Sequence, residues 1–231
     1  MKSFRFISVF IIVIFFMICS SGEKVEAWPA SNNSDIKILI DPGHGGIDGG
    51  AVAQDGTLEK HINLKISQKL KKALEKEKYT IIMTREEDKG LYTDGGKIRK
   101  KKLEDLHNRQ KMIRDTNCDV FVSIHLNMFP QQQYYGAQVW YAGNEKSRKL
   151  GLLTQDNLIQ DLDVNNKREA KAAKESYIIL RNPPDIPLII IECGFLSNAA
   201  ETAKLKDDGY QEKVANSIAR TLKEYLEKKQ Q

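Results

Sequence analysis

The chain has 231 residues, of which 41% are hydrophobic and 29% are charged, and its formal net charge is +5. The hydrophobic content excludes a disordered chain, and three cysteines are too few for a secreted domain held together by disulfides. The small positive charge does not indicate nucleic acid as a partner, so we expect one globular domain with a sizeable core.

The first 27 residues have the layout of a targeting segment. Lys2 and Arg5 precede an apolar run over residues 6–19, and small residues follow the run. This run is shorter than the roughly 18 to 20 residues that a permanent membrane-spanning helix needs. We therefore predict that residues 1–27 are a signal peptide, or a short anchor in which residues 6–19 tether the chain to a membrane, and that the protein is exported.

The rest of the chain alternates between strand-like and helix-like patterns. Residues 28–35 are polar, contain a proline and indicate a linker, so the folded domain is expected over residues 36–231. Short apolar runs predict strands, and apolar residues every four positions predict helices. The expected strands cover residues 36–41, 79–84, 119–125, 136–142 and 187–192, and the expected helices cover residues 59–77, 103–116, 145–160 and 210–228.

This alternation predicts a single α/β domain with a mostly parallel, twisted sheet and helices on both faces. Residues 85–102 and 161–186 show no clear period and are expected to be surface loops. In an open parallel sheet, ligands bind beyond the carboxyl ends of the strands. We therefore expect the active site at that edge.

Four polar side chains are expected at this edge. The stretch "DPGHGG" at residues 41–46 follows the first strand and contains His44. His125 and Glu192 each close a later apolar strand, and Glu59 begins the first helix after a glycine-rich segment. If the strands run parallel, the four side chains emerge close together.

The four residues are of the types that a zinc hydrolase uses. Two imidazoles and one carboxylate from three elements suit a catalytic zinc site, so we predict that His44, Glu59 and His125 hold one Zn²⁺ ion. An ionised Glu192 on an apolar strand is costly to bury without a role. We assign it as the general base that takes a proton from zinc-activated water and passes it to a leaving amine, which indicates hydrolysis of an amide-type bond.

Each of these residues also has an ordinary structural interpretation. His125 alone would be a satisfied core histidine, and His44 alone would be a turn residue. Glu59 alone would favour the positive end of a helix dipole. The glycine-rich turn could also cradle a phosphate, although it lacks the spacing of the common phosphate-binding motifs.

The cysteines and the remaining histidines are expected to be structural. Cys193 lies next to Glu192 and raises the alternative of a cysteine hydrolase, but no group is evident that would orient a histidine as its base. We expect Cys118 and Cys193 to pack in the core. His61 and His107 have polar neighbours within helical segments and are expected on the surface.

Taken together, these motifs resemble a known family in content and in order. They are "ILIDPGHGGIDGGA", Glu59 in "TLEKHINL", "MTR" at residues 83–85, "NR" at 108–109, "VFVSIHLN" at 120–127 and "IIIECGFLSN" at 189–198. This series resembles the zinc-dependent N-acetylmuramoyl-L-alanine amidases of type 3. The resemblance implies a peptidoglycan hydrolase that cuts the amide between the lactyl group of N-acetylmuramic acid and L-alanine of the stem peptide.

The resemblance also implies roles for individual residues. By position, the family's zinc ligands fall on His44, Glu59 and His125, and its catalytic glutamate falls on Glu192. Arg181, in "LRN", is implied to help hold the stem peptide or the glycan. Two alternatives remain open at this point: a module that binds peptidoglycan without turnover, and a zinc peptidase with another substrate.

The short leader and the bare domain resemble the sporulation type of this family. The segment between His125 and Glu192 is too short for the self-blocking helical insertion of the division-associated members. The sporulation type implies removal of stem peptides in the spore cortex, so that a partner deacetylase can form muramic-δ-lactam. It places the protein in the forespore intermembrane space or the cell wall, and the missing wall-binding module leads us to expect a separate exported activator or positioning protein.

Overall fold

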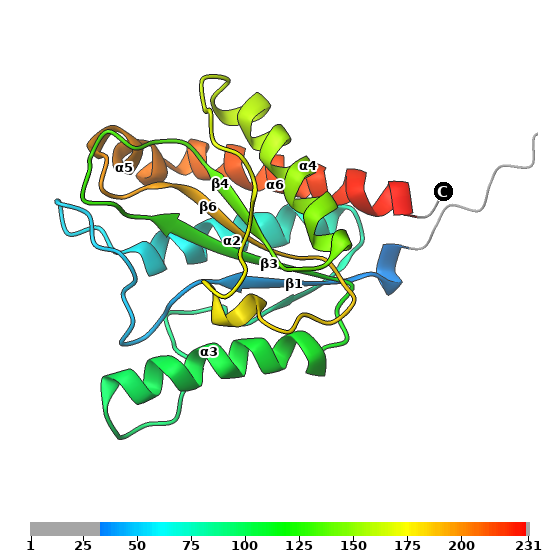
Figure 1. Ribbon diagram of the computed structural model, residues 1–231, viewed down its shortest axis with the longest axis horizontal. Coiled ribbons are helices and arrows are strands. Elements are labelled where there is room, and N and C mark those ends of the chain that lie inside the picture. Colours follow the sequence, from blue (N-terminus) through cyan, green and yellow to red (C-terminus); the bar gives the residue numbers. More distant parts are fainter. Residues whose placement is uncertain (1–32, 230–231) are drawn as a thin grey trace, which may run out of the picture. The chain divides into compact units, whose positions relative to one another are not determined.

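The computed structural model describes residues 33–229 (Figure 1), so the expected leader and most of the expected linker lie outside the described residues. No helix in this range has the length and apolar character of a membrane span. The strands are β1 (Lys37–Pro42), β2 (Thr80–Met83), β3 (Val120–Asn127), β4 (Gln138–Tyr141), β5 (Lys171–Ala172) and β6 (Leu188–Phe195). The helices are α2 (Glu59–Lys76), α3 (Ile98–Asp115), α4 (Glu145–Leu162), α5 (Ala199–Lys206) and α6 (Asp208–Lys229), and two 3₁₀ turns are η1 (Asn33–Asp35) and η2 (Ile178–Leu180).

The strands form one sheet in the order β2-β1-β3-β6-β4-β5, and this sheet is mostly parallel, as predicted. Strand β4 runs antiparallel to its neighbour β6, and β5, which pairs parallel to β4, shares this reversed direction. The reason is the short connection from β3, which contains no helix to carry the chain back to the opposite edge. The strands β1, β3 and β6 remain parallel, and their carboxyl ends share one edge.

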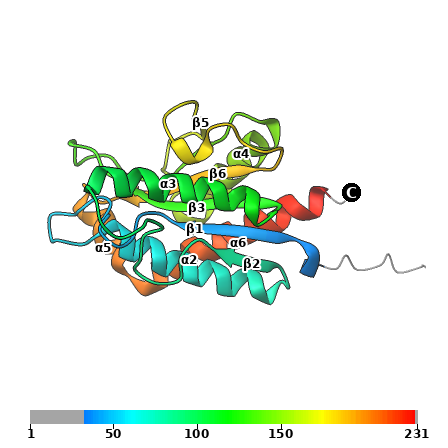
Figure 2. The same ribbon diagram turned by 90° about the horizontal axis from the view of Figure 1, so that it is seen from below.

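Helices cover both faces of the sheet, also as predicted. On one face, Ile38 and Ile40 of β1 share a buried cluster with the apolar side chains of α2, α4 and α6. On the other face, Leu39 of β1 and Phe121 of β3 belong to a second cluster with residues of α3 and η2. Figure 2 shows α2 and α3 on opposite sides of β1 and β3. The two-residue alternation along each buried strand explains this division.

Three parts of the chain form structure that the sequence pattern does not predict. Helix α3 begins at Ile98 rather than at residue 103. The sequence pattern does not reveal this first turn, because the turn is charged and exposed and shows no apolar period. Helix α5 was not expected, although Asn198 caps it by accepting hydrogen bonds from the backbone N–H groups of Ala200 and Glu201. Strand β5 and turn η2 lie within residues 161–186, where a loop is expected.

The remaining predicted elements agree with the structure to within three residues at each end. Cys118 and Cys193 are free and buried, as predicted for core packing. His61 has 53% of its side chain exposed, and His107 is exposed, as predicted for surface positions.

Candidate active site

The loop that carries His44 lies against His125 with no room for another side chain. A Cβ atom at Gly43 would lie 2.3 Å from the Nε2 and Cε1 atoms of His125. His44 itself has a backbone φ of 62°, in the left-handed region, which turns the chain back beyond the end of β1. Glycine beside a strained turn therefore brings the two imidazoles together, with ring centroids 4.9 Å apart.

Two buried arginines hold the backbone of this loop. Arg85 donates from Nε to the carbonyl of Pro42 and from Nη2 to that of Gly43, each over 2.9 Å. Arg109 donates from Nη1 to Pro42 over 2.9 Å and from Nη2 to the carbonyl of His44 over 2.7 Å. These arginines belong to the "MTR" and "NR" motifs, to which the sequence assigned no role. Their guanidinium groups fix where the His44 turn lies.

Arg109 is paired with a buried carboxylate at the end of β1. Asp41 forms an ion pair with the Arg109 guanidinium and accepts hydrogen bonds of 2.6 Å from Ser123 Oγ and Thr84 Oγ1. Burial opposes ionisation of Asp41, but the Arg109 charge and the two hydroxyl hydrogen bonds outweigh it and hold the pKa of Asp41 below its usual value. Asp41 therefore serves as a charged anchor for the loop.

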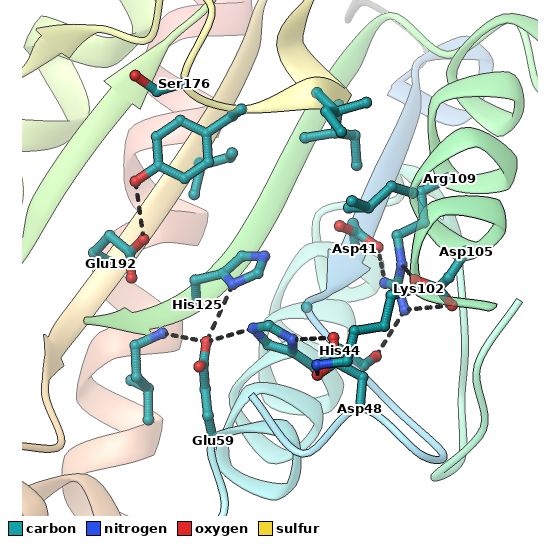
Figure 3. A pocket seen from close by; sticks show the side chains of 17 residues that line it. Asp41, His44, Asp48, Glu59, Lys102, Asp105, Arg109, His125, Ser176 and Glu192 are labelled. Carbon is teal, nitrogen blue, oxygen red and sulfur yellow. Dashed lines mark hydrogen bonds and ion pairs between the residues drawn. The ribbon is translucent and has the colours of Figure 1, made fainter. Parts of the chain in front are cut away.

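Glu59 lies between the two imidazoles (Figure 3). Its Oε1 atom is 3.2 Å from His44 Nε2 and 3.1 Å from His125 Nδ1. Backbone N–H groups of Leu126 and Ala51 donate to the same carboxylate, over 2.9 and 2.8 Å. Burial opposes ionisation, but hydrogen bonds with His125 and His44 dominate and hold the pKa of Glu59 well below its usual value. Glu59 is thus a buried anion facing two nitrogen ligands.

His44 is oriented by a carboxylate that the sequence analysis missed. Asp48 Oδ2 lies 2.8 Å from His44 Nδ1, which leaves Nε2 to face Glu59. Lys102 Nζ donates in turn to Asp48 Oδ1 over 2.7 Å. Burial favours the neutral imidazole, but the hydrogen bonds to Asp48 and Glu59 raise the pKa of His44 to about 10. The carboxylates around His44 therefore favour positive charge at this point of the site.

These residues fit a zinc ion. His44, Glu59 and His125 can each offer one ligand atom, and these atoms lie within 4.8 Å of one another. Imidazole and carboxylate are ligand types of catalytic zinc, and a carboxylate on the far nitrogen of a histidine is its usual supporting contact. The glycines preserve the space, since a Cβ at Gly50 would lie 2.6 Å from Glu59 Oε2 and 2.7 Å from His44 Cδ2.

Glu192 lies next to this group. It is paired with His125 in the register of β3 and β6, and it is 6% exposed. Its Oε1 atom accepts a hydrogen bond of 3.3 Å from the Tyr177 hydroxyl, and its Oε2 atom is buried without a partner among the described residues. Burial raises the pKa of Glu192 to about 7. A carboxyl group with this pKa can take and release a proton near neutral pH.

A cavity of about 380 Å³ connects the candidate metal ligands with Glu192. Lys102 and Leu106 of α3 form part of one wall, and residues 176–179 form part of another. Figure 3 shows the labelled side chains of His125 and Glu192 side by side, with Ser176 above Glu192 in this view. The cavity has the size of a small-ligand pocket, and all four predicted residues line it.

Arg181 is placed away from these groups. Its Nε atom donates to the Glu175 carbonyl over 3.0 Å and pairs with the Glu175 carboxylate over 3.2 Å. It is not among the residues that line the cavity. Its contribution to holding the stem peptide or glycan remains a prediction.

The three candidate ligands and the neighbouring Glu192 are typical of one class of protein, the metal-dependent hydrolases. Metal-dependent hydrolases of the α/β type combine a three-ligand metal set with a nearby carboxylate that handles protons. Comparison with known proteins then gives the family. The model of the N-acetylmuramoyl-L-alanine amidase family matches residues 38–224, and the chain belongs to this family.

Individual relatives agree with the family over most of the chain. A germination-specific N-acetylmuramoyl-L-alanine amidase of Bacillus subtilis (strain 168) is 36% identical over 233 residues, which cover 99% of this chain and 96% of the relative. The solved structure of the CwlD amidase from Clostridioides difficile, in complex with the GerS lipoprotein, is 42% identical, with a TM-score of 0.80, and the match covers 84% of this chain and 99% of that one. An N-acetylmuramoyl-L-alanine amidase structure from Clostridium difficile 630 is 29% identical with a TM-score of 0.73, and the match covers 85% and 98% of the two chains.

Proposed function

We propose that this chain is a zinc-dependent hydrolase of peptidoglycan that cuts the amide between the lactyl group of N-acetylmuramic acid and L-alanine of the stem peptide. The observation that carries the proposal is the convergence of His44, Glu59 and His125 on one point beside Glu192, in a chain of this amidase family. We assign the three ligands to one Zn²⁺ ion and Glu192 to proton transfer.

The proposed mechanism divides the work between the ion and the chain. Bound zinc would polarise the lactyl carbonyl and lower the pKa of a water molecule to about 7. Glu192, with a pKa of about 7, would take one proton from the attacking water and donate it to the departing amine nitrogen of L-alanine. The C–N bond breaks, the lactyl carbon gains a hydroxyl group, and the stem peptide leaves with a free amino terminus. Arg85 and Arg109 contribute by holding the backbone of the His44 turn.

Product analysis tests this proposal. Zinc-loaded wild-type protein and its Glu192→Gln variant would be incubated with purified peptidoglycan, and new amino termini would be identified by labelling and mass spectrometry. We expect new L-alanine amino termini with the wild type only, while both proteins hold about one zinc ion. Stem peptides that stay intact with the zinc-loaded wild type, both alone and with an added extract of sporulating cells that lack this enzyme, would refute the amidase assignment.

We further propose that the substrate is cortex peptidoglycan outside the cytoplasm. The support is the similarity to the germination-specific amidase of Bacillus subtilis, which extends over 99% of this chain. In this proposal residues 1–27 export the enzyme to the forespore intermembrane space or the wall, and a deacetylase acts next to form muramic-δ-lactam. Spores of a deletion strain are then expected to lack muramic-δ-lactam, and normal lactam content would contradict the role.

We also propose that a separate exported protein positions or activates the enzyme. The support is that the similar CwlD amidase of Clostridioides difficile was solved with the GerS lipoprotein. The test compares the purified zinc enzyme with a sporulating-cell extract, at equal enzyme concentration, on cortex peptidoglycan. A higher rate in the extract is expected, and equal rates would contradict the need for a partner.

A further inference from the structure

Tyr177 provides a contact to Glu192 that is separate from the candidate metal ligands. Its hydroxyl lies 3.3 Å from Glu192 Oε1, while Oε2 of the same carboxylate has no hydrogen-bond partner among the described residues. Both residues line the cavity. The two oxygens of Glu192 are therefore unequal: Oε1 is held by a hydrogen bond, and Oε2 is buried without one among the described residues.

The segment that carries Tyr177 is attached to the fold on both sides. Before it, the backbone N–H of Ala173 donates to the carbonyl of Tyr141 in β4 over 2.9 Å. After it, Gln110 of α3 donates from Nε2 to the carbonyls of Ile178 and Arg181, over 3.1 and 2.8 Å. The hydroxyl is thus delivered by a segment held between β4 and α3.

The ring of Tyr177 is also held. It packs against the indole of Trp140, with ring centroids 5.5 Å apart and an angle of 51° between the planes. Burial and the charge of Glu192 raise the pKa of Tyr177 above its usual value, so the phenol keeps its proton and acts as a donor at neutral pH. A phenol that donates to one carboxylate oxygen restricts rotation of the other.

We propose that Tyr177 is a positioning residue for the amide hydrolysis proposed above: its hydroxyl holds Oε1 of Glu192, so that Oε2 is the atom that accepts and returns the proton. The inference rests on the proposed function, because it assigns a task to Glu192 in that reaction. Among the described residues, Tyr177 makes no side-chain hydrogen bond to the candidate metal ligands, and its hydroxyl bonds only to Glu192. It acts only through the orientation of Glu192.

The variant Tyr177→Phe isolates the hydroxyl, because the ring and its packing against Trp140 are kept. A matched control is Tyr225→Phe on α6. The Tyr225 hydroxyl also makes a 3.3 Å hydrogen bond from a partly buried position, but to the backbone carbonyl of Lys146 and away from the cavity. The two variants remove the same atom at equal hydrogen-bond length.

The experiment measures kcat, KM and zinc content of the wild type and both variants, with a muramyl-peptide substrate of defined composition. For Tyr177→Phe we expect kcat to fall about tenfold while KM and zinc content stay within about twofold, because a positioned general base acts in the chemical step. Tyr225→Phe should match the wild type. The inference is overturned if Tyr177→Phe keeps kcat within about twofold, or if its loss of activity is accompanied by an equal loss of zinc.

Crystal structures of the zinc-loaded wild type and Tyr177→Phe give a readout independent of turnover. In the variant we expect the Glu192 carboxylate to rotate or to occupy several conformers, with the three candidate ligands unmoved. A carboxylate in the wild-type position would contradict the inference even if the wild type cleaved no peptidoglycan. A wild type that stays inactive even with an added extract of sporulating cells that lack this enzyme would refute the proposed function instead, so the two failures are distinguishable.

Discussion

Asp48 is hydrogen-bonded to the Nδ1 atom of His44, with 2.8 Å between Asp48 Oδ2 and His44 Nδ1. This contact sets the orientation of the imidazole and leaves Nε2 toward Glu59, 3.2 Å away. Asp48 is itself bound by Lys102, so the orientation of one candidate ligand depends on a chain of contacts that reaches α3. These contacts therefore link the α3 wall of the cavity to the candidate metal ligands.

Replacing Asp48 by alanine is expected to weaken zinc binding about 10- to 100-fold, because a histidine without its supporting carboxylate is less basic and less well oriented. Zinc affinity would be measured by competition with a chelator. The matched control is Asp55→Ala, which removes a carboxylate that pairs with Lys206 at the surface. Equal affinity in Asp48→Ala and the wild type would contradict the role of this contact.

Gly43→Ala tests the close approach of the turn to His125. The added Cβ would lie 2.3 Å from two atoms of the imidazole, so His125 must move away from the other ligands. We expect zinc affinity to fall at least about tenfold, with a loss of stability of about 1 to 3 kcal/mol from overpacking. Gly143→Ala is the control, because its Cβ would meet no atom within 4 Å. Wild-type zinc affinity in Gly43→Ala would show that the turn is not tightly packed.

The buried pair of Asp41 and Arg109 is expected to dominate the stability of the site. Arg109→Met leaves the Asp41 charge buried without its partner, which costs about 3 to 5 kcal/mol of unfolding free energy. Urea denaturation would measure this loss. The control Arg114→Met, at an exposed position of the same helix, should change stability by less than about 0.5 kcal/mol. The double variant Asp41→Asn with Arg109→Met should recover part of the loss, and a further additive loss would contradict the pairing.

Glu192 is expected to reduce stability at neutral pH. Because burial raises its folded-state pKa from 4.5 to about 7, the native protein holds this proton more tightly than the unfolded chain, and stability falls as pH rises from about 4.5 to 7. In the zinc-free protein, Glu192→Gln should therefore raise the unfolding free energy by about 3 kcal/mol at pH 8. The gain should vanish at pH 4.5.

The control for this effect is Glu169→Gln, at an exposed position, which should change stability little at either pH. A gain of equal size at pH 4.5 and pH 8 in Glu192→Gln would show that ionisation of Glu192 is not its cause. If Glu192→Gln is more stable but inactive, then the carboxylate needed for catalysis lowers the stability of the wild type.

The sequence predicted the sheet and the four central residues because both depend on local patterns. Buried strands such as β3 and β6 are unbroken apolar runs, and the polar residues that end them stand out. The rule that parallel strands share a carboxyl edge then brings His125 and Glu192 together. The direction of β4 was not predictable in this way, because the βαβ rhythm does not reveal a connection without a helix.

The supporting residues were harder to predict because their partners are distant in sequence. Arg109 binds the carbonyl of His44 from 65 positions away, and the Tyr177 hydroxyl meets Glu192 after a segment with no periodic pattern. Asp48 was also missed, although its partner is close in sequence: it lies four positions after His44, in a glycine-rich loop that can fold back on itself. The "MTR" and "NR" motifs contain Arg85 and Arg109, but the sequence does not show which backbone carbonyls these arginines bind, because the carbonyls are brought to them only by the folded turn.

The most direct test of the central claim is the position of oxygen incorporated from water. The zinc-loaded enzyme would be incubated with a disaccharide-peptide substrate in H₂¹⁸O, and the products would be analysed by mass spectrometry. The account predicts one ¹⁸O atom in the lactyl carboxylate of the muramic acid product, and an unlabelled peptide that begins with a free L-alanine. Label in a carboxylate of the peptide, with none in the lactyl carboxylate, would instead identify a peptidase and contradict the account.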